Sequence, residues 1–540
     1  MSPVRPVMST TGTLPGLLEE LAACHGDREA LISTRGRLSF ADLAALADRL
    51  AGALAARGVR RGTHVALLLP NWPEWLALAF AVWRCGGVLV PLNTLYRARE
   101  LGHALAHAEV SLLIATRRFL RHDYASALAE LGIACHDGDV RAAEFPALRG
   151  VVFLDPATPL DLTPLFGSGL EHGPPGPGPV PEDPATIVFT SGSTAAPKGV
   201  VHTHASLRLA ADGDAAVLGI APEDRTWGYL PFFFAGGLVA VALTTLSRGA
   251  AVVLQDVFEP GETLRLLEAE RVSVFFAWPH QAEALIAHPR FATTRLRLRK
   301  GVGANTKWAA ALYGPDHHAV GSYGMTETPP LCSAWPWDAP LARRTGSHGI
   351  AVGHRELRIV DPDSGAVLGR GVEGEICVRG PELLVGYWGE PRGACFDADG
   401  FFHTGDLGRF DDDGALHFVG RLKDVIKTAG TNVAAAEVEA VLLEHPAVAA
   451  AHVVGIADAL RGEDVAAFVV LKTPVDEDAL LGHCRQRLAS YKVPRRLWVR
   501  GEDALPTKGT GKVDKAALRA EAATLTAADD RGAGRRTPRG

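Results

Sequence analysis

The feature that most constrains the fold is an alternation of short apolar runs with a helical pattern early in the chain. Residues 65–69 and 88–92 are uninterrupted apolar runs, and the apolar segment between them opens with Asn71 and Pro73 and ends near Cys85. Short apolar runs are typical of strands buried on both faces, and strands that alternate with helices form mostly parallel sheets. The sequence therefore predicts an α/β fold whose sheets are covered by helices.

The second half of the chain follows other patterns. Residues 340–420 contain short strand patterns separated by turn sequences such as DPDSGAVL and DDDGALHF, which predicts a β-rich subdomain. The last block mixes helical patterns at 435–443 and 478–488 with strand patterns at 449–456 and 465–471. A chain of 540 residues is too long for one ordinary domain. We expect a large multi-layer N-terminal domain at 1–420, a small α+β C-terminal domain at 421–523 and a disordered tail at 524–540.

Composition excludes some classes of function. The net charge is −6 and only 21% of residues are charged, which argues against bulk binding to nucleic acid or to an anionic membrane surface. The seven cysteines are scattered without metal spacing, which favours reduced thiols and a cytoplasmic protein. Residues 226–247 carry no charged side chain, but Pro231, Gly236 and Gly237 interrupt them. We expect this segment to be the buried wall of a cavity and not a membrane span.

A loop rich in hydroxyl groups and glycine follows the apolar strand pattern at 185–189. A helical pattern begins near His204, so the sequence predicts a strand-to-helix loop. Backbone N–H groups, hydroxyls and an ammonium in such a loop can surround phosphate oxygens. The Walker pattern is absent. The candidate phosphate-binding residues of the loop are Thr190, Ser191, Gly192, Ser193, Thr194 and Lys198.

Further motifs follow in a fixed order: GAN at 303–305, SYGMTE at 322–327, TGD at 404–406, GRLKD at 420–424 and PTKGTGK at 506–512. Together with the loop, this series resembles the adenylate-forming (ANL) superfamily, which contains acyl-CoA synthetases, luciferases and peptide-synthetase adenylation domains. The resemblance covers residues 15–520, almost the whole chain. It implies a ligase in which a carboxylate attacks the α-phosphorus of ATP to give acyl-AMP and pyrophosphate, and a thiol then attacks the activated carbonyl.

The resemblance also implies roles for individual residues. The loop residues would hold the β- and γ-phosphates of ATP, Thr326 would donate to the α-phosphate, and Glu327, with Thr190, would hold Mg²⁺. Arg421 would add donors to the ribose hydroxyls. The remaining expected nucleotide contacts are Gly303, Ala304 and Asn305 at the adenine edge, Tyr323 and Gly324 on its face, and Asp406 at the ribose.

For the C-terminal domain the resemblance implies movement. Lys512 would bridge the substrate carboxylate and the α-phosphate during adenylation. Rotation about a hinge at Lys423 would then bring Thr428, Ala429 and Gly430 to the pantetheine arm of CoA, where Gly430 leaves space for the chain. The implied cofactor and co-substrate are ATP with Mg²⁺ and coenzyme A.

An aromatic and uncharged set of residues is expected to form the acyl pocket. It favours a bulky hydrophobic carboxylic acid and disfavours an amino acid, whose ammonium would require an acidic partner. The sequence leaves open which acid this is. The expected lining residues are Phe232, Phe233, Phe234, Gly236, Gly237, Trp278, Gly301 and Pro329.

Other functions stay open beside an acyl-CoA synthetase. Ala195 and Phe234 stand where the family commonly has glycine and histidine, so one alternative is a variant that converts supplied acyl-AMP and CoA without adenylating an acid. A second is a ligase that loads a separate acyl-carrier protein. A third is a non-catalytic nucleotide- or acyl-binding protein, against which Glu327 and Lys512 count. The oligomeric state also stays open.

Overall fold

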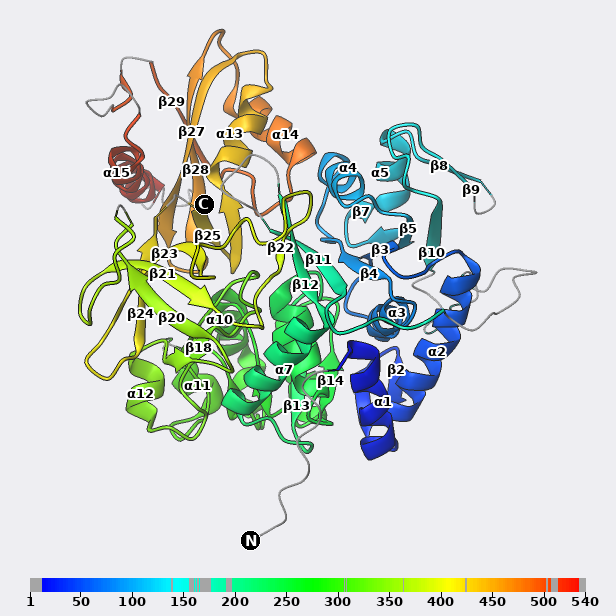
Figure 1. The fold of residues 1–540 in the computed structure, drawn as a ribbon. Helices are drawn as coiled ribbons and strands as arrows, with labels where there is room; N and C mark the ends of the chain where they lie inside the picture. The colour runs from blue at the N-terminus through cyan, green and yellow to red at the C-terminus, as the bar shows by residue number, and fades with distance from the viewer. Residues whose placement is uncertain are drawn as a thin grey trace.

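The structure of the protein is a computed structural model. It describes residues 12–136, 139–154, 160, 162, 165, 176–190, 197–304, 306, 308–362, 364–422, 425–501, 504–506 and 513–533. Figure 1 shows a large N-terminal part with the smaller C-terminal part seated on one end of it.

Two sheets form the framework of the N-terminal part. The first has seven strands, of which the first five in spatial order are parallel. They are, in that order, β10 (Gly150–Leu154), β5 (Leu112–Thr116), β3 (His64–Leu68), β4 (Val88–Pro91), β11 (Pro184–Thr190), β12 (Lys198–Thr203) and β22 (Gly386–Tyr387). The strands expected at 65–69, 88–92 and 185–189 are therefore confirmed.

The second sheet has six strands and is parallel except for its last pair. Its spatial order is β16 (Lys300–Gly301), β15 (Val274–Phe275), β13 (Arg225–Gly228), β14 (Ala251–Leu254), β1 (Glu29–Ser33) and β2 (Gly36–Ser39).

Helices cover both sheets and fill the space between them. The helix α3 is buried along its whole length up to Trp83 because it packs in a core built from residues of both sheets and of neighbouring helices. A helix apolar on all sides is stable only in such an interior. The helices of this part are α1 (Leu14–His25), α2 (Phe40–Ala56), α3 (Pro73–Arg84), α4 (Ala98–His107), α5 (Tyr124–Glu130), α7 (His204–Leu218), α8 (Thr244–Leu246), α9 (Pro260–Ala269), α10 (Pro279–Ala287), α11 (Ala309–Tyr313) and α12 (Leu341–Gly346). A π-helix, η1 (Gly236–Leu243), and a 3₁₀-helix, η2 (Pro289–Thr293), complete the set.

The β-rich subdomain is confirmed as a four-stranded antiparallel sheet with its own core. Its strands are β20 (Glu356–Val360), β21 (Gly374–Arg379), β23 (Phe402–Phe410) and β24 (Leu416–Arg421). Three smaller sheets complete this part: a three-stranded one of β17 (Ser322–Tyr323), β18 (Ser333–Ala334) and β19 (Ile350–Ala351), and two-stranded ones of β6 (Arg118–Phe119) with β7 (His122–Asp123) and of β8 (Ala134–His136) with β9 (Asp139–Arg141).

The C-terminal part is a five-stranded sheet with helices, as expected for an α+β domain. Its elements are β25 (Val425–Thr428), β26 (Thr431–Ala434), α13 (Ala435–Leu443), β27 (Val448–Asp458), β28 (Gly462–Leu471), α14 (Glu477–Arg487), β29 (Arg496–Val499) and α15 (Lys515–Ala533). The expected tail at 524–540 needs correction, because α15 continues to Ala533. The alanine-rich sequence of residues 516–529 favours a helix. Residues 534–540 lie outside the described residues.

The expected strand-to-helix loop after β11 is also corrected. It joins two antiparallel strands, β11 and β12, with Thr190 opposite Lys198. The apolar, β-branched and buried residues 200–203 extend β12 before α7 begins at His204. The N-terminus of α7 therefore lies one strand away from the loop.

Residues 226–247 include η1 and α8, and Leu230 with residues 233–237 forms part of a cavity wall, as expected. Among the described residues, no helix is long and apolar enough to cross a membrane.

Candidate active site

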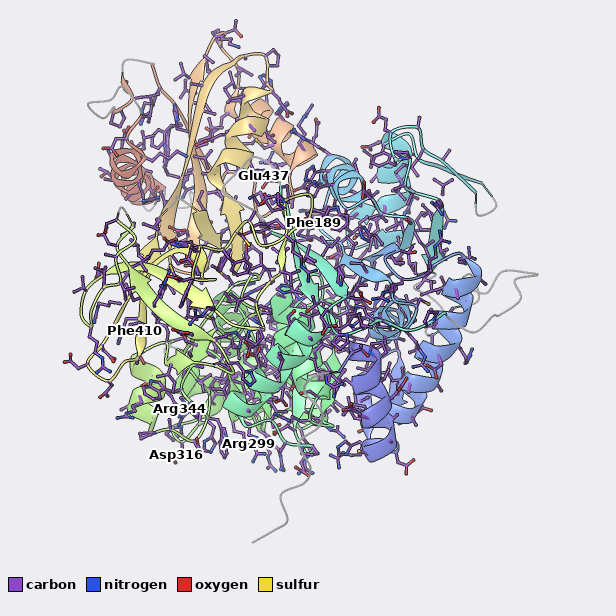
Figure 2. The ribbon with its side chains drawn as sticks, viewed as in Figure 1. Phe189, Arg299, Asp316, Arg344, Phe410 and Glu437 are labelled. Carbon is purple, nitrogen blue, oxygen red and sulfur yellow. The ribbon has the colours of Figure 1, made fainter. Side chains whose placement is uncertain are left out.

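A cavity of about 200 Å³ lies where the C-terminal part meets the N-terminal part. Segments far apart in the sequence contribute to it, so only the folded chain assembles it. Its lining residues are Pro91, Asn93, Tyr96, Phe189, Thr190, Pro197, Leu230, Phe233, Phe234, Ala235, Gly236, Gly237, Trp278, Met325, Thr326, Pro330, Gly430, Thr431, Tyr491 and Lys492. In Figure 2, Phe189 of β11 and Glu437 of α13 mark the two sides of this interface. The cavity unites residues expected at the phosphates, the acyl group and CoA.

Trp278 lies between the acyl side and the C-terminal part. Its ring meets Phe234 edge to face at 6.4 Å. On the other side it faces Gly430, which has a φ of +76°. A Cβ built on Gly430 would lie 1.9 Å from Cδ1 of Trp278. Only glycine combines this backbone conformation with this close approach, so Gly430 fixes how closely the two parts meet.

The acyl side of the cavity is apolar. Phe233 and Phe234 pack against each other at 4.6 Å, just before the π-helix η1. A Cβ on Gly237 would lie 2.1 Å from the carbonyl oxygen of Pro231, so glycine is required for the chain to turn into η1. Leu230, Met325 and Pro330 also line this side, although we did not expect them from the sequence.

Three expected acyl-pocket residues lie elsewhere. Phe232 is fully buried in the core, where its ring packs against Trp75 at 5.2 Å. Gly301 lies on β16, the edge strand of the second sheet, where it pairs with Phe275. Pro329 is buried, and its carbonyl accepts a hydrogen bond from Arg355 at 2.6 Å, while the neighbouring Pro330 takes its place in the lining.

Side chains on two neighbouring strands, β12 and β22, hold Thr326 and Glu327 in place. The carbonyl of Thr326 lies 2.9 Å from Nε2 of His202 on β12. Burial lowers the pKa of His202 to about 4, so this histidine is neutral near pH 7. Glu327 is only 7% exposed, and its Oε1 accepts a hydrogen bond from the Tyr387 hydroxyl at 3.1 Å. The carboxylate is therefore held in a defined place.

Lys198 lies at the end of the loop, close to the same tyrosine. Its Nζ lies 4.5 Å from the centre of the Tyr387 ring and 2.9 Å from Oε1 of Glu390. Because about a third of the Lys198 side chain is exposed, its ammonium can exchange Glu390 for a stronger anion such as a phosphate.

Tyr323 and Asp406 are joined directly. The Tyr323 hydroxyl donates to Oδ2 of Asp406 at 2.9 Å, and the Tyr323 ring stacks on Phe418 at 5.8 Å. Glu375 accepts a hydrogen bond from the N–H of Gly405 at 2.9 Å and so supports the turn that carries Asp406. The expected adenine-binding ring and ribose-binding carboxylate therefore lie together.

Glu375 also belongs to a cluster that could hold a metal ion, with Cys377 and His403. Nδ1 of His403 lies 2.7 Å from Oε2 of Glu375. This cluster is built on β21 and β23 and lies outside the lining of the active-site cavity.

Some of the other expected site residues lie within the described part of the chain, and the rest lie outside it. Of the expected CoA contacts, Thr428 is buried, and Ala429 has a φ of +50° and donates its N–H to the carbonyl of Arg461. Of the expected adenine contacts, Gly303 and Ala304 pack near Trp308. The backbone of Gly324 approaches the carbonyl of Pro330, and the backbone of Arg421 pairs with that of Asp406. The expected site residues that lie outside the described residues are Ser191, Gly192, Ser193, Thr194, Asn305, Lys423 and Lys512.

Sequence reasoning missed a buried ion cluster at the interface. Nζ of Lys492 donates to Oε1 of Glu437 at 2.8 Å and to Oε1 of Glu100 at 3.1 Å, and all three residues are buried. Next to them, Asn93 donates to the Tyr491 hydroxyl at 3.2 Å. Lysine is usually exposed, so no local pattern distinguishes Lys492.

Comparison with known proteins identifies the family of the chain. The model of the family "AMP-binding enzyme" matches residues 18–388, and that of "AMP-binding enzyme C-terminal domain" matches residues 437–512. Feruloyl-CoA synthase from Amycolatopsis sp is 36% identical over 490 residues, which cover 89% of this chain and 93% of that protein.

Two solved structures are similar over most of both chains. An o-succinylbenzoate CoA synthetase from Bacillus subtilis, bound with its product analogue OSB-NCoA, matches with a TM-score of 0.79 at 28% identity, covering 94% of this chain and 98% of that one. ATP-bound MatB from Rhodopseudomonas palustris matches with a TM-score of 0.66 at 30% identity, covering 95% of this chain and 99% of that one.

The chain therefore belongs to the family of AMP-binding enzymes, the adenylate-forming superfamily. Within this family it is an AMP-forming acyl-CoA ligase, with a carboxylic acid, ATP and CoA as its substrates.

Proposed function

We propose that the enzyme activates an aromatic carboxylic acid as acyl-AMP and transfers the acyl group to CoA, and that its C-terminal domain rotates about Lys423 between the two steps. The observation that carries this proposal is the single cavity in which Thr326, Trp278 and Gly430 meet. It joins the expected α-phosphate contact, the acyl pocket and the expected pantetheine contact.

Chemistry of the lining supports an aromatic acid. Phe233, Phe234 and Trp278 offer ring faces and edges, and the acyl side carries no charged side chain among its described residues. Two similar proteins act, by their names, on feruloyl and succinylbenzoyl groups, which are aromatic.

The arrangement of the two parts corresponds to the thioester-forming pose. Gly430 lies among the described residues that line the cavity. The TM-score is higher with the structure bound to a CoA-product analogue than with the ATP-bound structure, at similar coverage and identity. A different placement of the C-terminal domain in the ATP-bound structure would lower its TM-score in this way.

Magnesium fits the donor set at Glu327. Glu327 follows Thr326, which lines the cavity together with Thr190, and carboxylate and hydroxyl oxygens are the hard ligands that Mg²⁺ prefers. When bound, Mg²⁺ would neutralise phosphate charge during adenylation. Glu327 and Tyr387 orient this position, Thr326 binds the α-phosphate, Lys198 binds the outer phosphates, and Asp406 binds the ribose.

Separate assays of the two steps test this function. In the wild type we expect ATP–pyrophosphate exchange that depends on an aromatic acid from a panel including ferulate. Lys512→Ala should lose this exchange but still convert synthetic acyl-AMP and CoA to the thioester. If the wild type shows no exchange with any acid and yet turns over acyl-AMP rapidly, it is the non-adenylating variant. If holo-acyl-carrier protein replaces CoA as the better acceptor, it is a carrier-protein ligase.

The hinge requires its own test. Lys423→Pro should slow the step made in the pose it disfavours and spare the other. Equal loss of both half-reactions would exclude a hinge role for Lys423.

A further inference from the structure

Three side chains of the β-rich subdomain belong to the types that bind transition metals. Glu375 and Cys377 lie two residues apart on β21, so they share one face of the sheet, and Cys377 pairs with His403 on the adjacent strand β23 (Figure 1). Their oxygen, sulfur and nitrogen atoms all lie within 4.8 Å of one another. We call these three residues the Glu-Cys-His cluster. Sequence spacing hides it, because its members come from two strands.

The distances within the cluster suit a small tetrahedral ion. Nδ1 of His403 lies 2.7 Å from Oε2 of Glu375 and 3.5 Å from Sγ of Cys377. Bonds to zinc are about 2.0–2.3 Å long, so the ligand atoms around a tetrahedral zinc ion are about 3–4 Å apart. Small side-chain rotations would therefore admit the ion. Glu375 and Cys377 are buried and His403 is exposed, so the ion would enter from solvent past the imidazole.

A second carboxylate supports the histidine of the cluster. Oδ2 of Asp397 lies 3.4 Å from Nε2, the other ring nitrogen of His403. Metal-bound histidines almost always donate their second N–H to a carboxylate, a carbonyl or water, which fixes the tautomer and the orientation of the ring. A proton held on Nε2 by Asp397 leaves Nδ1, the nitrogen nearest to Glu375 and Cys377, with a lone pair for an ion.

Charges around the cluster also balance for a divalent ion. Arg358 on β20 lies opposite Cys377 and is ion-paired with Asp397. Burial, together with Glu375, raises the pKa of the Cys377 thiol to about 12, so a bound ion must displace the thiol proton to solvent. A divalent ion and Arg358 would then offset the thiolate, Glu375 and Asp397. Asp399, which also pairs with Arg358, is largely exposed.

We propose that the Glu-Cys-His cluster binds one zinc ion, with a water molecule from solvent as the fourth ligand. A thiolate and an imidazole favour zinc over Mg²⁺ and Ca²⁺, which prefer oxygen ligands. The site is separate from the magnesium position at Glu327 and lies outside the lining of the active-site cavity. It does not depend on which acid or acceptor the enzyme uses.

The ion would stiffen the segment that carries Asp406. The register of β21 with β23 shifts between Glu375 and Cys377, where β23 bulges around Gly405. Oε1 of Glu375 accepts the N–H of Gly405 at 2.9 Å, and this oxygen can stay in place while Oε2 binds zinc. Bulges beside active sites commonly direct a side chain. Zinc here is therefore a structural ion behind the expected ribose contact.

Titration with Co²⁺ tests the site in protein first freed of metal with a chelator. Cobalt adopts the geometry of zinc, and a thiolate ligand gives it a near-ultraviolet charge-transfer band. The wild type should develop this band up to one equivalent of Co²⁺, and Zn²⁺ but not excess Mg²⁺ should remove it. Cys377→Ser should lose the band. His403→Gln should weaken binding at least about tenfold, and Asp397→Asn should lower the affinity about tenfold but keep the band at saturation.

Matched controls replace the same residue types elsewhere. Cys484→Ser removes a buried thiol from α14, and His417→Gln removes a ring on β24 that lies 2.8 Å from Asp411. Both should bind Co²⁺ as the wild type does. A wild type without the band would overturn the proposal, as would a band that survives in Cys377→Ser.

The exposed position of His403 keeps the test decisive if Cys377→Ser does not fold. Unchanged Co²⁺ affinity in His403→Gln would then exclude the site. Binding to the folded state should also raise the melting temperature of the wild type in Zn²⁺, and this increase should be absent in His403→Gln. Equal increases in both proteins would mean that zinc binds elsewhere.

Discussion

Nζ of Lys492 lies 3.1 Å from Oε1 of Glu100, and this buried ion pair joins the C-terminal part to α4 of the N-terminal part. The second partner of Lys492, Glu437, belongs to the C-terminal part and would move with it. Burial raises the pKa of Glu100, and the ammonium of Lys492 opposes this effect. In the rotation that we propose, this pair would therefore exist in only one arrangement of the two parts.

Glu100→Gln should therefore weaken the thioester-forming pose selectively. Glutamine can still accept the N–H of Arg97 that Glu100 Oε2 now accepts, so α4 keeps its first turn. We expect thioester formation from supplied acyl-AMP to fall between about three- and tenfold, because a buried charge loses its partner. ATP–pyrophosphate exchange should stay near the wild-type rate.

Glu444→Gln provides the matched control for that variant. Glu444 pairs with Arg99 across the same interface, but both side chains are exposed, so the pair contributes little. The expected result is unchanged rates in both assays. Equal slowing of both half-reactions in Glu100→Gln would show that Glu100 supports the fold and not one pose.

Gly430→Ala should impair the same step by a steric route. The added Cβ would meet the Trp278 ring, and alanine is strained at a φ of +76°. We expect thioester formation to fall at least tenfold, while ATP–pyrophosphate exchange is retained, as measured in the two separate assays. Gly482→Ala, where a Cβ meets nothing within 4 Å, should behave as the wild type. A loss of exchange equal to the loss of thioester formation would contradict this prediction.

The fold was predictable from sequence where local pattern and burial agree. The helix expected at 435–443 has those bounds in α13, and the strands around Val65 and Val88 pair in parallel as expected. The loop after Thr190 was expected to join a strand to a helix, but it joins β11 to β12. The sequence hides β12 because this buried strand is short and runs into α7 without a turn residue.

The site was predictable only in part, because side-chain direction in irregular segments depends on distant contacts. Phe232, Phe233 and Phe234 are equivalent by sequence, yet Phe232 alone turns into the core. Its N–H donates to Oδ1 of Asn71 at 3.0 Å, a residue 161 positions away, which sets the direction of the segment. Tyr387 and Lys492 were missed for the same reason: their partners Glu327 and Glu100 are remote in sequence.

Buried neutral histidine should make stability depend on pH. His202 is fully buried with a pKa of about 4, below the usual value of about 6.5 in the unfolded chain. Between these values only the unfolded state binds the proton, so the free energy of unfolding decreases as pH falls from 6.5 toward 4. In urea denaturation at pH 7.5, 6.0 and 5.0, His202→Gln should reduce this slope by up to about 1.4 kcal/mol per pH unit. The same slope in variant and wild type would contradict this prediction.

The hydrogen bond from Tyr387 to Glu327 should control magnesium binding in the adenylation step. Tyr387→Phe keeps the ring that faces Lys198 but removes the hydroxyl that orients the carboxylate, so the Mg²⁺ concentration for half-maximal ATP–pyrophosphate exchange should rise about tenfold. A chelator should abolish exchange and spare thioester formation from supplied acyl-AMP. Tyr313→Phe, which loses a buried hydrogen bond to the carbonyl of Phe275 away from Glu327, is the control and should leave the Mg²⁺ dependence unchanged. A Mg²⁺ requirement shifted equally in both variants would mean that Tyr387 acts through general stability, and Glu327 would then lose its support as the magnesium ligand.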